Sequence, residues 1–148
     1  MIALDAWCLR WNVPPQALRE LLISDVPQTG DATSEAGVQA RVRLEAPACN
    51  VTLWRNNSGA AVDDTGRHIR YGLGNDSKRV NDVFKSSDLI GIRHDGRFVA
   101  LECKPPGWRF SSNDKRAVAQ ARFMYHVRAA GGIAGFVTSV SDLHALVR

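Results

Sequence analysis

Three residues near the middle of the chain carry side chains that could act together on a phosphate ester. Asp88 precedes an apolar stretch, and Glu102 and Lys104 end a second one. Between the stretches lies Asp95-Gly96, a dipeptide typical of β-hairpin turns. In such a hairpin Asp88 lies beside Glu102, and Lys104 projects from the same face as Glu102, because side chains alternate along a strand. The spacing therefore predicts two carboxyl groups and an amine at one end of a sheet.

Two neighbouring carboxylates repel each other unless a positive charge lies between them. A divalent cation is the usual partner, and hard oxygen ligands select Mg²⁺, with Mn²⁺ as an expected substitute. Such an ion polarises a phosphate and lowers the pKa of a bound water, while Lys104 could orient that water or stabilise developing charge. Cys103, between the two polar residues, is expected to point into the core. The alternative is that Asp88 and Glu102 are strand-end carboxylates in solvent and that Lys104 is an exposed lysine paired to Glu102.

The elements that must position these residues are those of an α/β domain. Ser34 is a good N-cap for the first helix of this domain, and Ser112 and Asn113 are good caps for a later one that stops at the glycine pair after residue 130. The residues between Gly74 and Ser87 are predicted to form a polar loop. The expected order is a helix at 35–45, a strand at 51–55, a turn at 56–60, strands at 67–73, 86–92 and 97–104, a helix to about 130, a strand at 133–139 and a helix at 140–147.

The first part of the chain differs in character. Residues 1–33 are predicted to form a helical extension and linker, and residues 34–148 the main domain. Pro14 and Pro15 suit the first turn of a helix with an apolar leucine face, which we expect to dock on the main domain and cover it. A helix-turn-helix is a weaker alternative, because this part is net acidic. The turn-forming residues 26–34 are predicted to be the linker.

Composition excludes several classes of protein. A length of 148 residues suits one domain, and a content of 45% hydrophobic and 23% charged residues is that of a globular chain. The chain has three cysteines, Cys8, Cys49 and Cys103. Their odd number and the lack of CxxC spacing disfavour a disulfide framework and a structural zinc site. The four histidines share no metal-ligand spacing and are expected at the surface or in the core. With no membrane-spanning segment and no basic leader, we expect a cytoplasmic protein without a membrane partner.

The basic charge is unevenly distributed. Residues 1–40 contain two basic and five acidic side chains, a net charge of −3, so residues 41–148 carry +7 of the total of +4. A polyanionic partner is therefore plausible for residues 41–148, with a solvated basic surface as the alternative.

The residues around the hairpin resemble a known family. The sequence resembles the PD-(D/E)XK nuclease signature at Asp88 and, after an apolar strand, at Glu102-Cys103-Lys104. The residues around this motif resemble the VRR-NUC branch of that superfamily. The further similarities, over about residues 34–142, are an acidic residue on the leading helix (Glu35), the stretch at 54–60, a glutamine on the later helix (Gln120) and the closing glycine pair (Gly131, Gly132). Two features differ: Ser87 stands where the family has proline, and the loop at 74–87 is longer and more basic. The second difference could alter the choice of substrate.

This resemblance implies a restriction-endonuclease-like αβββαβ core with a mixed central sheet flanked by helices. It implies a metal-dependent DNA endonuclease, structure-specific on branched DNA such as four-way junctions or flaps, working as a homodimer in a bacterial or phage-infected cell. The implied catalytic residues are Asp88, Glu102, Lys104, Glu35 and Gln120; the implied metal ligands are Asp88, Glu102 and the backbone carbonyl of Cys103, with Glu35 as a further candidate. The alternatives are a non-catalytic DNA-binding or scaffold protein and a sequence-specific restriction-type nuclease.

Residues that flank the predicted site could contact DNA. They are basic, amide or aromatic side chains that can donate to phosphate oxygens or stack on an unpaired base. The candidates are Arg55, Asn56 and Asn57 after a strand, Lys78, Arg79 and Lys85 in the polar loop, and Trp108, Arg109 and Phe110 after the catalytic strand. Core packing is the favoured alternative for Trp108, and solvation is the alternative for the others.

Overall fold

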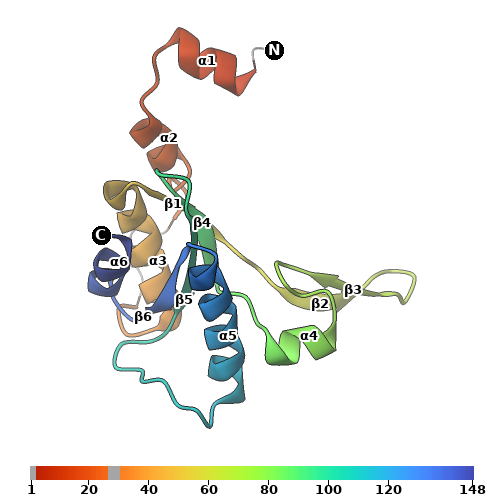
Figure 1. Cartoon of the computed structure of the whole chain (residues 1–148). Helices are drawn as coiled ribbons and strands as arrows, with labels where there is room; N and C mark the ends of the chain where they lie inside the picture. Colours follow the sequence, from red (N-terminus) through yellow and green to blue (C-terminus); the bar gives the residue numbers. More distant parts are fainter. Residues whose placement is uncertain (1–2, 27–30) are drawn as a thin grey trace.

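The computed structural model describes residues 3–26 and 31–148, and its body is a mixed sheet between helices (Figure 1). The sheet has the order β1-β4-β5-β6, in which β1, β4 and β5 are antiparallel neighbours and β6 runs parallel to β5. Its strands are β1 (Val51–Arg55), β4 (Leu89–Arg93), β5 (Phe98–Cys103) and β6 (Ile133–Val137). Helices α3 (Glu35–Glu45) and α6 (Val140–Val147) cover one face, and α5 (Lys115–Ala129) covers the other. The expected mixed α/β architecture is confirmed.

Strand β5 lies between β4 and β6 and is buried on both faces. Its residues Val99, Leu101 and Cys103 join the apolar core under α3 and α6, whereas Ala100 joins the core under α5. Because strand side chains alternate, Glu102 belongs to the α5 face, where it meets a side chain of that helix. A carboxyl group thus occupies a position that an apolar residue would fill in a purely structural strand, and Cys103 points into the core as expected.

The two helices nearest the predicted site begin at side-chain caps. The Ser34 hydroxyl accepts from the Gly37 N–H at the start of α3, as predicted. The N-cap of α5 lies one residue after the predicted caps: it is Asp114, whose carboxylate accepts from the N–H groups of Arg116 and Ala117, and the helix begins at Lys115. Arg116 therefore lies in the first turn of α5.

The segment between β1 and β4 differs most from the prediction. Strands β2 (Gly59–Val62) and β3 (His68–Tyr71) form a separate two-stranded hairpin, here called the arm, which projects away from the body in Figure 1. The expected turn at 56–60 is therefore partly strand, and the strand expected at 67–73 is not part of the main sheet.

The prediction of a polar loop at 74–87 is also wrong, because this segment contains a short helix, α4 (Lys78–Val83). Ser77 caps this helix by accepting from the Val80 N–H, and the Phe84 ring that follows packs on Phe123 of α5, with 5.4 Å between ring centroids. A local cap, aromatic contacts of Phe84 and hydrogen bonds to α5 order a segment whose composition is that of a loop.

The N-terminal residues form two short helices, α1 (Leu4–Arg10) and α2 (Pro15–Leu21), and do not cover the main domain as expected. No residue of α2 is buried; it touches the body at the short 3-10 helix η1 (Ala46–Cys49), where Arg19 donates to the Asn50 side chain at 2.9 Å. Helix α1 stands apart from the sheet in Figure 1. Of the predicted linker at 26–34, residues 27–30 lie outside the described residues.

Within residues 3–26 and 31–148, no helix combines the length and the apolar character that crossing a bilayer requires.

Candidate active site

The hairpin of β4 and β5 brings the two predicted carboxyl groups together. Its register pairs Leu89 with Leu101, which makes Asp88 and Glu102 the next opposing residues. The Asp88 N–H donates to Glu102 Oε2 at 3.1 Å, and the Cys103 N–H donates to Asp88 Oδ2 at 3.1 Å. The predicted convergence is confirmed, and one backbone hydrogen bond holds each carboxyl group in place.

Lys104 and Gln120 complete the arrangement around Glu102. The Lys104 ammonium lies 2.8 Å from Glu102 Oε1, and the Gln120 side-chain amide donates to the same oxygen. Glu102 and Gln120 are fully buried and Lys104 is 8% exposed, whereas Asp88 is half-buried. The alternative that Glu102 is a strand-end carboxylate in solvent is therefore wrong.

This arrangement leaves negative charge incompletely balanced. Burial, and next the charge of Asp88, raise the pKa of Glu102 to about 7, although the Lys104 and Arg116 charges act in the opposite direction. Two further oxygens at the site, Gln120 Oε1 and Ser87 Oγ, are buried without a hydrogen-bond partner within the described residues. Crowded carboxylates and unpaired oxygens are a donor set suited to a hard cation such as Mg²⁺.

A polar cleft of about 570 Å³ opens in front of Asp88. Elements far apart in the sequence line it: α3, the end of β1, the arm, the segment before β4, and the first turn of α5. The lining residues are Gln39, Arg55, Asn56, Asn57, Ser58, Tyr71, Lys85, Ser86, Ser87, Asp88 and Arg116. Of the predicted DNA contacts, the structure thus places Arg55, Asn56, Asn57 and Lys85 beside Asp88. A larger hollow of about 690 Å³, mainly apolar, lies at the opposite end of the hairpin, where Asp95 and Gly96 form the turn.

The two neighbouring asparagines have different surroundings. The Asn56 side chain donates to Ser86 Oγ and to the Ser87 carbonyl, both at 2.9 Å, and accepts from the Leu73 N–H at 3.1 Å. Its backbone N–H also donates to the Asp88 carbonyl at 2.7 Å. Asn56 therefore links the end of β1 to the residues before β4, while Asn57 is exposed at the cleft.

Arg116 is a cleft residue that sequence reasoning missed. It lies in the first turn of α5, one turn before Gln120, so both side chains project from the same side of the helix. Its charge acts to lower the pKa of Glu102. Burial, and next the charge of Arg116, lower the pKa of Lys85. The signal that could have found it is its spacing from Gln120.

Other predicted DNA contacts lie outside the cleft. Lys78 pairs with Asp82 at 2.6 Å on exposed α4, and Arg79 is exposed on the same helix. The Trp108 ring packs on Phe136, with 4.7 Å between centroids, and the Lys104 ammonium lies 5.7 Å from the ring centre. Packing of Trp108, the favoured alternative, is confirmed. Arg109 and Phe110, which follow it, are exposed.

Glu35 occupies the first turn of α3 and is exposed. The pKa of the Cys103 thiol is raised by burial, then by the charges of Asp88 and Glu102, and also by that of Glu35. Glu35 therefore lies at the same end of the sheet as the two other carboxyl groups, but on the α3 side.

Comparisons with known proteins return no match, whether with family models, with curated proteins or with solved structures. Support for a function therefore comes from the residues and geometry of this chain.

Proposed function

We propose that the protein is a metal-dependent DNA endonuclease of the PD-(D/E)XK type, similar to the VRR-NUC branch. The observation that carries the proposal is buried Glu102, which bonds to the Asp88 backbone, Lys104 and Gln120 at the open end of a hairpin. The order α3-β1-β4-β5-α5-β6 also agrees with a restriction-endonuclease-like αβββαβ core into which the arm and α4 are inserted.

The proposed metal ligands are Asp88, Glu102 and the backbone carbonyl of Cys103, with Glu35 as a further candidate. The oxygen-only donor set and the raised pKa of Glu102 fit a divalent cation, because such an ion offsets the repulsion between the carboxylates. When bound, Mg²⁺, or Mn²⁺ in its place, would polarise the scissile phosphate and make a bound water more acidic.

The chain's own residues supply the remaining functions. Gln120 fixes the orientation of Glu102, and Lys104, bonded to the same oxygen, can donate to the attacking water or to the phosphate. Arg116 and Lys85 at the cleft can hold phosphate oxygens on either side of the cut. Water adds to phosphorus in line with the 3′-oxygen, which leaves, so the products carry 5′-phosphates.

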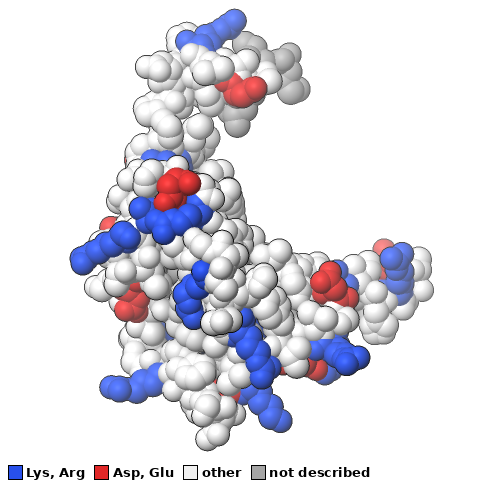
Figure 2. All heavy atoms as spheres, in the orientation of Figure 1, with Lys and Arg blue, Asp and Glu red and all other residues white. Residues whose placement is uncertain are grey.

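The proposed substrate is branched DNA, cut by a homodimer in the cytoplasm. Figure 2 shows basic side chains spread over the body, including the region of α5, rather than gathered in one patch. The arm offers a surface for a second copy, since Ile69 and Tyr71, which project from the same face of it, are both exposed. Two sites related by a dyad could cut opposed strands of a junction.

The test is cleavage of linear, flap and four-way-junction DNA in Mg²⁺ or Mn²⁺, with EDTA as the control. Cleavage of branched substrates in either metal supports the proposal. Binding of every substrate with no cleavage in either metal would favour the non-catalytic scaffold. Cleavage of linear DNA that follows base sequence would favour a restriction-type nuclease. Against the scaffold, a carboxyl, an ammonium and an amide are buried together at a position that packing alone would fill with apolar groups.

A further inference from the structure

A second set of metal-binding side chains lies at the junction of α3, η1 and α6. Glu45 ends α3, Cys49 ends η1, and His144 lies in α6. A carboxylate oxygen, the thiol sulfur and a ring nitrogen of these residues all lie within 4.8 Å of one another, and His144 Nε2 is 2.8 Å from Glu45 Oε1. Sequence spacing does not reveal this set, because packing of α6 brings His144 to residues far away in the sequence.

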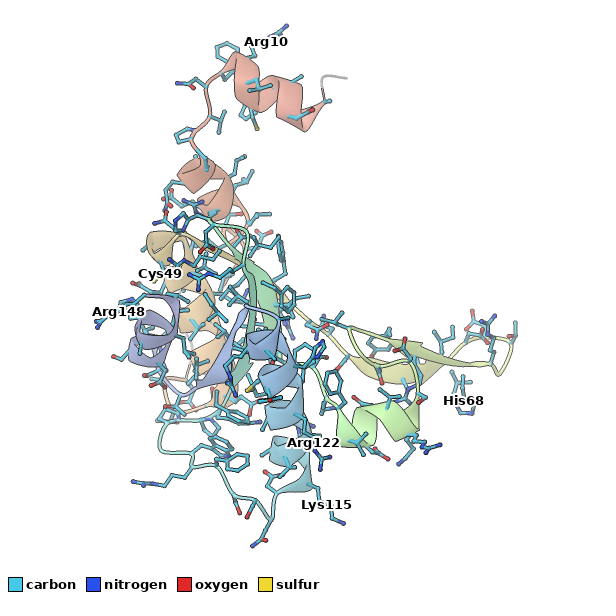
Figure 3. All side chains as sticks on the ribbon, in the orientation of Figure 1. Arg10, Cys49, His68, Lys115, Arg122 and Arg148 are labelled. Carbon is cyan, nitrogen blue, oxygen red and sulfur yellow. The ribbon has the colours of Figure 1, made fainter. Side chains whose placement is uncertain are left out.

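The set is held by buried neighbours. In the core under α3 and α6, Ala46 follows Glu45, and Leu143 and Val147 lie on either side of His144. These contacts fix the two helices while the three polar side chains stay half-buried and reachable from solvent. A hollow of about 290 Å³ adjoins them and leaves space for an ion with a bound water. Figure 3 shows Cys49 on the side of the molecule where α3 and α6 lie, with the C-terminal Arg148 nearby.

We propose that Glu45, Cys49 and His144 bind a zinc ion that ties α6 to the end of α3. Zinc takes thiolate, imidazole and carboxylate ligands in tetrahedral sites, whereas Mg²⁺ prefers oxygen ligands alone. On binding, the Cys49 thiol releases its proton to solvent and His144 binds as the neutral ring, so the two negative ligands balance the charge of the ion. The ion replaces the hydrogen bond between Glu45 and His144, and a water fills the fourth position.

This site is separate from the proposed nuclease site. Its residues belong to α3, η1 and α6, on the side of the sheet opposite to α5, and none of them lines the polar cleft. The ion is therefore expected to act on stability rather than on phosphate chemistry.

Cobalt titration of the whole chain tests the proposal, because Co²⁺ replaces Zn²⁺ and reports thiolate ligation by a charge-transfer band in the near ultraviolet. We expect one Co²⁺ per chain with this band, displaced by Zn²⁺, and a higher melting temperature in Zn²⁺. The carboxylates of the polar cleft cannot produce a thiolate band, so cobalt binding there is distinguishable.

Five variants complete the experiment. Cys49→Ser should remove the band, and His144→Ala should weaken cobalt binding by more than about tenfold. Cys8→Ser, at the partly exposed cysteine of α1, and Asp88→Ala, in the polar cleft, should keep the band. A wild-type protein without the band, or a band that persists in a Cys49→Ser variant folded by circular dichroism, would overturn the proposal. Should Cys49→Ser not fold, a band of unchanged affinity in Glu45→Gln and His144→Ala would overturn it equally.

Discussion

Glu102 is a charged residue that the fold keeps out of water. Its carboxyl group lies against the Asp88 backbone, Lys104 and Gln120, and its side chain is 0% exposed. Burying a carboxylate costs stability even when it is paired, and similar apolar residues often do as well or better. Retaining an acid at this position is readily explained if its charge is used by a cation.

The first prediction concerns this carboxylate. Glu102→Gln keeps the size of the side chain but removes a charged ligand, so cleavage of junction DNA should fall by at least about 100-fold. Binding of the same DNA should remain within a few-fold of the wild type, because Glu102 is buried and cannot reach the duplex. Single-turnover cleavage and a binding titration measure the two effects. Glu20→Gln, at an exposed glutamate of α2, is the matched control, and equal cleavage by both variants would contradict the assignment.

A second prediction follows from the pKa of Glu102, raised from an ordinary 4.5 to about 7. Because the folded pKa is the higher one, this group stabilises the metal-free fold below pH about 4.5, and that contribution is lost as the pH rises through about 7. Mg²⁺ binds the ionised form, so it should raise the melting temperature more at pH about 8 than at pH about 6. Melting curves with and without Mg²⁺ at both values measure the difference. It should disappear in Glu102→Ala, and equal shifts in the wild type would rule out Glu102 as a ligand.

Arg116 provides the third prediction, because it brings a positive charge to the cleft beside Lys85. Arg116→Ala should weaken DNA binding and lower cleavage by about tenfold to 100-fold, with Arg116→Lys in between, since lysine keeps the charge but not the paired donors. The control is Arg109→Ala, an exposed arginine outside the cleft lining. A loss of the same size in Arg109→Ala would mean that general charge, and not the cleft, is measured.

At the scale of elements, the polar cleft depends on how β1 is joined to β4. The chain leaves the sheet after β1, forms the arm and α4, and returns at Asp88. Asn56 spans this excursion by bonding to Ser86, Ser87 and Leu73. The carboxyl group of Asp88 is thus positioned by a side chain outside the hairpin as well as by the hairpin itself.

The fourth prediction compares the two asparagines. Asn56→Ala removes three side-chain hydrogen bonds, so it should lower the free energy of unfolding by about 1–3 kcal/mol and reduce cleavage by displacing Asp88. Asn57→Ala should leave stability unchanged and affect DNA binding alone, since that side chain is exposed. Urea unfolding and cleavage rates of both variants test this. Equal stability of the two would contradict the structural role of Asn56.

At the scale of the molecule, the arm is the feature that a monomer explains least well. An isolated two-stranded hairpin is marginally stable in water. One face of this hairpin exposes large side chains, with Tyr71 at 49% and Ile69 at 41% exposure. Contact with a second copy would both cover these side chains and stabilise the hairpin.

The fifth prediction is that the wild-type protein is a dimer and that Ile69→Glu is a monomer, measured by light scattering after size-exclusion chromatography. The dimer should cut both strands of a four-way junction in one binding event, whereas the monomer should release nicked intermediates. Leu9→Glu, at an exposed leucine of α1, is the control and should remain dimeric. A monomeric wild type, or a dimer that persists in Ile69→Glu, would exclude the arm as the interface.

The sequence alone was sufficient to predict those elements whose caps, turns and alternating side chains involve residues close together in the chain. Ser34 marks the start of α3, the Asp95-Gly96 turn marks the hairpin, and alternation along β5 places Glu102 and Lys104 on one face. These interactions form between near neighbours in the chain, so spacing alone predicts them, including the meeting of Asp88 with Glu102.

Tertiary packing decided the rest. The strand at 67–73 has the pattern of a sheet strand, yet β3 pairs with β2 outside the main sheet, because pairing depends on partners that periodicity cannot identify. Arg116 reaches the cleft because α5 packs across the sheet, and His144 meets Cys49 because α6 packs on α3. Both proposed sites combine side chains from distant parts of the sequence, and only the folded chain brings those parts within bonding distance.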